Sequence, residues 1–80
     1  RFLKMSISIE LENQSDVARL EQLLPRVNDQ FQTYLRELRV EDLQGSAGIY
    51  RLRQELLARV SQAIYPAKVR NVLFREMLIQ

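Results

Sequence analysis

The sequence predicts an α+β fold in which two strands enclose two helices, in the order strand–helix–helix–strand (β-α-α-β). Apolar residues recur with a period of two at residues 2–12, with spacings of three and four across residues 16–64, and in a strand-like stretch at 68–79. If the two helices form a hairpin, the second strand returns antiparallel beside the first, and the helices pack on one face of the sheet. Eighty residues make one domain at most, so residues 1–80 are predicted to form a single unit.

The first strand is predicted to have one apolar face and one polar face. Residues 2–12 alternate strictly, as in a strand with one buried face and one face in contact with water. The apolar positions are Leu3, Met5, Ile7, Ile9 and Leu11. The polar positions are Lys4, Ser6, Ser8, Glu10 and Glu12.

The first helix is predicted over about residues 16–38, with Asn13 or Ser15 as its cap and Asp16 in its first turn. Pro25 lies inside this range and predicts a kink, or two short helices nearly in line. The apolar spacing also fits a coiled coil, but Pro25 and the breadth of the apolar face favour packing on a sheet. The apolar positions are Val17, Leu20, Leu24, Val27, Phe31, Tyr34 and Leu38.

The second helix is predicted to begin at Ser46 as its N-cap and to end before Pro66. Gly48 falls in its first turn, where a glycine costs little. One face of this helix is apolar, and its members are Ile49, Leu52, Leu56, Val60, Ala63 and Ile64.

The second strand, at residues 68–79, has apolar side chains in both phases. Val72 and Phe74 share a phase with Glu76, whereas Leu73 and Met77 take the other phase. Either the strand is buried on both faces, or a bulge changes its phase. An isolated sheet of two strands is marginal in water and leaves two open edges. We therefore expect a further strand from an upstream segment, or pairing with neighbouring subunits.

Residues suited to catalysis or cofactor binding are scarce. The chain has no histidine and no cysteine, which removes the usual general base and the commonest zinc ligands. Glu10 and Glu12 fit a solvated strand face, and Asp42 after Glu41 fits the cap of a turn. The glycine-rich stretch 45–48 lacks the Gly-Lys-Ser/Thr element of a phosphate-binding loop and fits a helix start. We expect no catalytic residues, no cofactor and no metal site.

Basic residues do not form a clear nucleic-acid site. The formal net charge is only +2, which gives no strong field toward phosphates. Arg51, Glu55 and Arg59 follow one another at intervals of four and predict a charge ladder on an exposed helix face. No nucleic-acid partner is therefore expected, although a small soluble nucleic-acid-binding α+β module is the alternative from a different functional class.

The surfaces that could contact a partner protein are on the two predicted strands. No run of about 20 apolar residues is present to span a bilayer. The chain starts at Arg1 without a methionine, from which we expect an upstream segment. The interface candidates are the polar face of the first strand and three charged residues of the second, namely Lys4, Ser6, Ser8, Glu10, Arg70, Arg75 and Glu76.

Both ends of the sequence, and three short stretches between them, carry recognisable motifs. The opening reads Arg-Phe-Leu-Lys-Met-Ser-Ile-Ser-Ile-Glu-Leu, and the ending reads Val69-x-x-Val72-Leu73-Phe74-x-Glu76-x-Leu78-Ile79-Gln80. Between them lie matching motifs in the same order: Leu24-Pro25-Arg26-Val27-x-Asp29, Asp42-Leu43 and Gly48-x-x-x-Leu52-Arg53-x-Glu55-Leu56. Together these motifs resemble the FliL family of flagellar basal-body proteins. The resemblance covers nearly the whole chain, and the ending is its most specific part.

This resemblance implies a single-pass inner-membrane protein whose membrane span lies upstream of residue 1 and whose C-terminal domain is periplasmic. The family domain is similar to stomatin (SPFH) domains, which implies self-association into a ring or another oligomer. The implied role is to support the flagellar stator proteins at the basal body. No catalytic, cofactor or metal residues come with the family. A stomatin-like scaffold of another membrane complex is the alternative.

Overall fold

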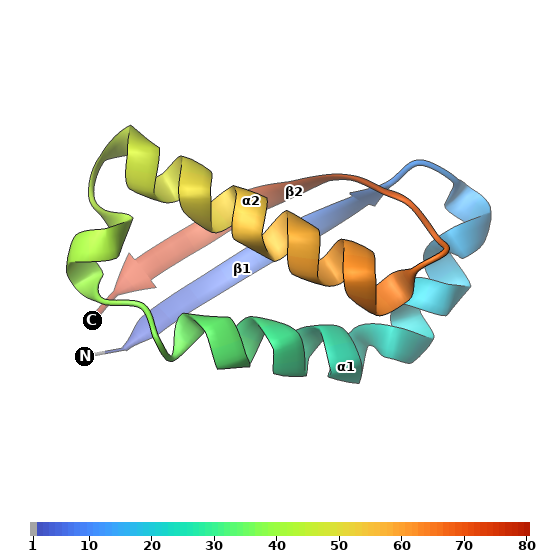
Figure 1. Ribbon diagram of the computed structural model, residues 1–80, viewed down its shortest axis with the longest axis horizontal. Coiled ribbons are helices and arrows are strands. Elements are labelled where there is room, and N and C mark those ends of the chain that lie inside the picture. Colours follow the sequence, from blue (N-terminus) through green and yellow to red (C-terminus); the bar gives the residue numbers. More distant parts are fainter. Residues whose placement is uncertain (1) are drawn as a thin grey trace.

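The computed structural model describes residues 2–80 and contains one antiparallel sheet of two strands with two helices on one face (Figure 1). The predicted α+β class and the strand–helix–helix–strand order are confirmed. In Figure 1 the α2 helix crosses in front of the sheet, and α1 runs below the two strands in this view. The elements are β1 (Leu3–Leu11), η1 (Gln14–Asp16), α1 (Val17–Leu35), η2 (Val40–Leu43), α2 (Gly45–Ile64) and β2 (Val69–Ile79).

Two β-bulges explain the irregular pattern of the second strand. The register passes from Ser6 opposite Glu76 to Ile7 opposite Phe74, which leaves Arg75 without a partner on β1. A second shift near the start of β2 leaves Arg70 without a partner in the same way. Each bulge inserts one residue and changes the phase of the side chains. Of the two alternatives for this strand, the bulge is therefore correct, and β2 is not a central strand.

The α2 helix supplies the centre of the core. Leu52, Leu56, Val60 and Ile64 are at most 1% exposed, as the spacing of this helix predicts. They pack with Val27 and Phe31 of α1, with Val72 of β2 and with the inward residues of β1. Burying one such aliphatic side chain contributes about 1.5–3 kcal/mol. The helix pair and the inner face of the sheet therefore share one core.

The α1 helix is continuous through Pro25 and ends three residues earlier than the sequence predicts. The ring of Pro25 is on the exposed side of the helix. Leu24 is 45% exposed, so the prediction that it packs in the core is wrong. Leu23 packs against the core in its place. The apolar face of α1 is broad, and its sequence does not determine the rotation of the helix about its own axis.

The start of α2 is built on a close approach between two backbone segments. The helix begins at Gly45, whose φ is 77°, and Gln44 before it makes no side-chain cap hydrogen bond. The prediction that Ser46 is the N-cap is therefore wrong. Gly48 is buried, and a Cβ at this position would overlap the carbonyl oxygen of Asp42. Glycine is thus required where α2 crosses η2.

An arginine joins the start of α1 to the end of α2. The Nε of Arg19 donates to the Ile64 carbonyl oxygen at 3.0 Å, and its Nη2 donates to the Tyr65 carbonyl oxygen at 2.7 Å. The last carbonyls of a helix lack partners within the helix and carry the negative end of its dipole. Arg19 therefore satisfies two acceptors and fixes one helix against the other.

None of the helices in residues 2–80 combines the length and the hydrophobicity needed to cross a membrane.

Candidate interaction surface

The face of the sheet opposite the helices carries most of the interface residues that the sequence predicts. Because β1 alternates, its polar side chains point away from the core, opposite the β2 residues that also point away. We call this surface the outer sheet face. Its cross-strand pairs are Lys4 with Leu78, Ser6 with Glu76, Ser8 with Leu73, and Glu10 with Asn71.

The two predicted arginines of β2 are the two bulge residues. Arg75 folds over the outer sheet face, where its Nε donates to the Ser8 hydroxyl oxygen at 2.8 Å. Arg70 is exposed at the other bulge. A bulge commonly redirects a side chain that regular pairing would place elsewhere. The structure therefore brings Ser8 and Arg75 together directly, and Ser6 and Glu76 together as a cross-strand pair.

The charges of the outer sheet face are free of ion pairs within the described residues. Lys4, Glu10, Arg75 and Glu76 are all exposed, and the one ion pair in residues 2–80 joins two other side chains, both on α2. Signs are mixed on this surface, so it has no strong net charge. Leu78, which is 42% exposed, adds an apolar site beside Lys4 that sequence reasoning missed. The signal that could have found it is plain alternation, because Leu78 shares the phase of Glu76 and no bulge lies between them.

That ion pair confirms one step of the predicted charge ladder, between Glu55 and Arg59, but the other step, between Arg51 and Glu55, is wrong. The Nε of Arg59 donates to Oε1 of Glu55 at 2.9 Å, whereas Arg51 makes no ion pair with Glu55 in the described chain. The Arg59 guanidinium also lies 5.0 Å from the ring centroid of Tyr34 on α1, and its Nη1 reaches the Gln30 carbonyl oxygen at 3.4 Å. Arg59 therefore links the two helices instead of extending an exposed ladder.

Tyr34 has a raised pKa in this setting. Burial is the main cause, and the negative charge of Glu55 acts in the same direction, whereas the positive charge of Arg59 lowers the pKa. A tyrosine with a raised pKa is protonated at neutral pH. Its ring therefore supplies a neutral surface for the cation of Arg59.

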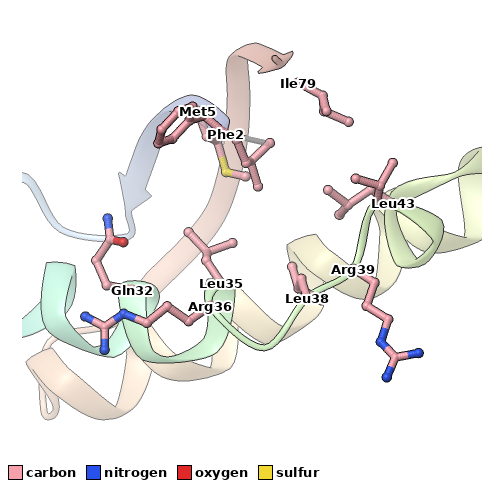
Figure 2. A pocket seen from close by; sticks show the side chains of 11 residues that line it. Phe2, Met5, Gln32, Leu35, Arg36, Leu38, Arg39, Leu43 and Ile79 are labelled. Carbon is pink, nitrogen blue, oxygen red and sulfur yellow. The ribbon is translucent and has the colours of Figure 1, made fainter.

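A second feature is a hollow at the end of the sheet where the chain termini meet (Figure 2). Its volume is about 440 Å³. Most of its lining is apolar and comes from the start of β1, the last residue of β2, the end of α1, and η2. We call it the terminal hollow, and its lining residues are Phe2, Leu3, Met5, Gln32, Leu35, Arg36, Leu38, Arg39, Val40, Leu43 and Ile79.

Asp42 and the glycine-rich stretch 45–48 have local structural roles. The carboxylate of Asp42 accepts a hydrogen bond from the Arg39 backbone N–H at 2.9 Å, which confirms that Asp42 caps the turn at η2. Residues 45–48 form the first turn of α2. No three side chains of the histidine, cysteine, aspartate or glutamate type gather into a possible metal site in residues 2–80.

Comparison with known proteins gives one consistent result. The sequence matches the family model described as "Flagellar basal body-associated protein FliL" over residues 1–80. It is 54% identical over 78 residues to the "Flagellar FliL protein" of Caulobacter vibrioides strain NA1000 / CB15N, and equally to that of strain ATCC 19089 / CIP 103742 / CB 15. The aligned region covers 98% of this chain but only 38% of the length of each relative.

Proposed function

Because the chain belongs to the FliL family of flagellar basal body-associated proteins, we propose that it supports the stator units of the bacterial flagellar motor. The family is a flagellar basal-body family and not an enzyme family. Residues 1–80 act in this proposal as a single stomatin-like domain that oligomerises, as a ring or in another form, on the periplasmic face of the inner membrane. A membrane span elsewhere in the longer protein anchors it.

The observation that carries this proposal is the open sheet. Each of the two strands has one edge that no strand in residues 2–80 pairs with, and the helices cover one face alone (Figure 1). Exposed strand edges and an uncovered sheet face are places where other chains add. Neighbouring subunits and stator proteins are thus the partners we propose for the outer sheet face and its edges.

The residues proposed to make the contact are those of the outer sheet face, with Arg70 at its margin. Their mixed charges favour specific pairing with a complementary surface over general attraction to a polyanion. Arg75 and Lys4 are the best targets for substitution, because both are exposed. Reversing their charge leaves the core unchanged.

Gene deletion followed by a motility assay tests the role in the motor. We expect weaker swimming, and a larger loss in swarming, where the motor works under load. Complementation with the Lys4→Glu/Arg75→Glu variant should restore motility poorly. Arg26→Glu, a charge reversal on the exposed surface of α1, should restore it fully. Unchanged swimming and swarming after deletion would disprove the stator role.

Sedimentation velocity over a dilution series tests self-association. We expect the sedimentation coefficient to fall with dilution for the natural chain, and the Lys4→Glu/Arg75→Glu variant to stay monomeric at higher concentration than Arg26→Glu. A monomer that is insensitive to dilution would count against oligomerisation through this domain. Oligomerisation together with normal motility in the deletion strain would favour the alternative, a scaffold of another membrane complex.

A further inference from the structure

The terminal hollow is large enough to accept side chains from a partner. Its volume of about 440 Å³ is within the range of roughly 300–1,000 Å³ for ligand clefts in proteins. Phe2 is 78% exposed and Ile79 is 45% exposed at its mouth. Large apolar side chains grouped around an open cleft are typical of interaction sites. The hollow is separate from the outer sheet face, because its walls include the end of α1 and η2.

The polar part of the rim is basic. The polar side chains of the lining are Gln32, Arg36 and Arg39, and none of the described residues that line the hollow is acidic. Neither arginine forms an ion pair within residues 2–80. Figure 2 shows the two guanidinium groups on opposite sides of the rim, directed away from Leu35 and Leu38 in the middle. A basic rim around an apolar centre is complementary to a segment that combines apolar side chains with carboxylates.

We propose that the terminal hollow binds a short amphipathic peptide segment of a partner protein. The apolar side chains of the segment enter between Leu35, Leu38 and Ile79, and its aspartate or glutamate side chains pair with Arg36 and Arg39. Two separate arginines require two carboxylates set apart along a chain. A peptide provides that arrangement, whereas a fatty acid carries a single carboxylate at one end. The apolar contacts supply affinity, and the arginines select acidic over basic segments.

Selection from a display library of short random peptides tests this inference on the chain itself. We expect recovered peptides to combine leucine-like residues with aspartate or glutamate. Their affinity, measured by fluorescence anisotropy, should fall at least about tenfold for Leu38→Glu. For Arg36→Glu/Arg39→Glu the affinity should fall about threefold to tenfold, as expected for exposed ion pairs. Peptides in which lysine replaces the aspartate or glutamate should bind this variant better than the original peptides do.

Matched controls separate a lost site from a lost fold. Leu24→Glu and Arg26→Glu change exposed positions of α1 that do not line the hollow, so both should bind the peptides normally. The double arginine variant alters only exposed side chains, and its circular dichroism spectrum should match that of the natural chain. Its result therefore stands even if Leu38→Glu is less stable.

Three results would overturn the inference. The first is that no binders are recovered, or that the recovered peptides bind Leu38→Glu and Arg36→Glu/Arg39→Glu as well as they bind the natural chain. The second is binding of dodecanoate at the hollow, lost in the arginine variant, when no peptide binds. The third is weaker self-association of Leu38→Glu in sedimentation velocity without peptide binding, which would assign the hollow to contacts between copies. Each leaves the motility test of the outer sheet face unaffected, so the two proposals fail separately.

Discussion

The sheet has one end where α2 returns to β2 and another where the chain termini meet, and the two ends are packed differently (Figure 1). At the first end Ile64 is fully buried, Ala67 is 7% exposed, and Arg19 holds the last carbonyls of α2. At the other end Phe2 is 78% exposed beside the terminal hollow. We call the end where α2 returns to β2 the closed end, and the end where the chain termini meet the open end. The difference indicates that stability is concentrated at the closed end and that surface for binding remains at the open end.

The largest effect should come from truncating the same residue type at the two ends. Ile64→Ala at the closed end removes a side chain that is fully buried, and should lower the free energy of unfolding by about 2–5 kcal/mol. Ile79→Ala removes a side chain that is 45% exposed, and should cost less than about 1 kcal/mol. Urea denaturation of both variants measures the difference. Equal losses would show that the two ends are equally packed.

Gly48→Ala should give the next largest effect, because the new Cβ meets the Asp42 carbonyl oxygen. Overpacking of this kind costs about 1–3 kcal/mol, even though alanine is the better helix former. Gln44→Ala, at an exposed position just before the helix, is the control and should change the midpoint of urea denaturation little. A stabilised Gly48→Ala variant would mean that η2 and α2 can move apart at the open end.

Arg19→Met keeps much of the side-chain volume and removes both hydrogen bonds to the end of α2. Bonds from a charged donor contribute about 1.5–3 kcal/mol each when well ordered, and less at a partly exposed site. We therefore expect a loss of about 1–2 kcal/mol. Arg19→Lys should recover only part of it, because lysine lacks the planar fork that reaches two carbonyls. Arg26→Met on the exposed side of the same helix should be within about 0.5 kcal/mol of the natural chain.

The smallest effect should be a pH dependence of the folding stability. It arises where the two helices meet, between the two ends of the sheet. The pKa of Tyr34 is raised in the folded chain, so folding favours its protonated form. The stability that this provides is complete below the unfolded pKa of about 10 and is lost as the pH rises through the folded pKa.

Thermal unfolding across this range should show a steeper alkaline loss in the natural chain than in Tyr34→Phe. Tyr50 and Tyr65 are present in both proteins and are 57% and 76% exposed, so the comparison isolates Tyr34. Identical alkaline profiles would show that the environment of Tyr34 has no effect on stability.

The parts of the fold that follow a regular period could be predicted from the sequence. The two faces of β1 and the buried side of α2 are as the spacing of their apolar residues predicts, because each has a single apolar face. The phase of β2 could not be predicted, because two-sided burial and a bulge at Arg75 give the same pattern of letters. Only the partner strand distinguishes them.

The candidate sites also divide into those that a regular period predicts and those that it does not. The polar side chains of β1 were found because they alternate with apolar ones. The terminal hollow was missed, because its walls come from segments that are distant in sequence. Arg19 was missed for a related reason: its partners are carbonyl oxygens 45 and 46 residues away, and no sequence pattern marks a backbone acceptor.

The bulges in β2 also bear on how the strand tolerates changes in length. Arg70 and Arg75 are the two residues that have no partner on β1. Deleting Arg75 would leave Phe74, Glu76 and Met77 in plain alternation, with both apolar side chains still facing the helices. Deleting Leu73, between the two bulges, would instead shift one of its neighbours to the wrong face. The pairing of the two strands should therefore tolerate deletion of either arginine of β2, and it should be disrupted by a deletion between them.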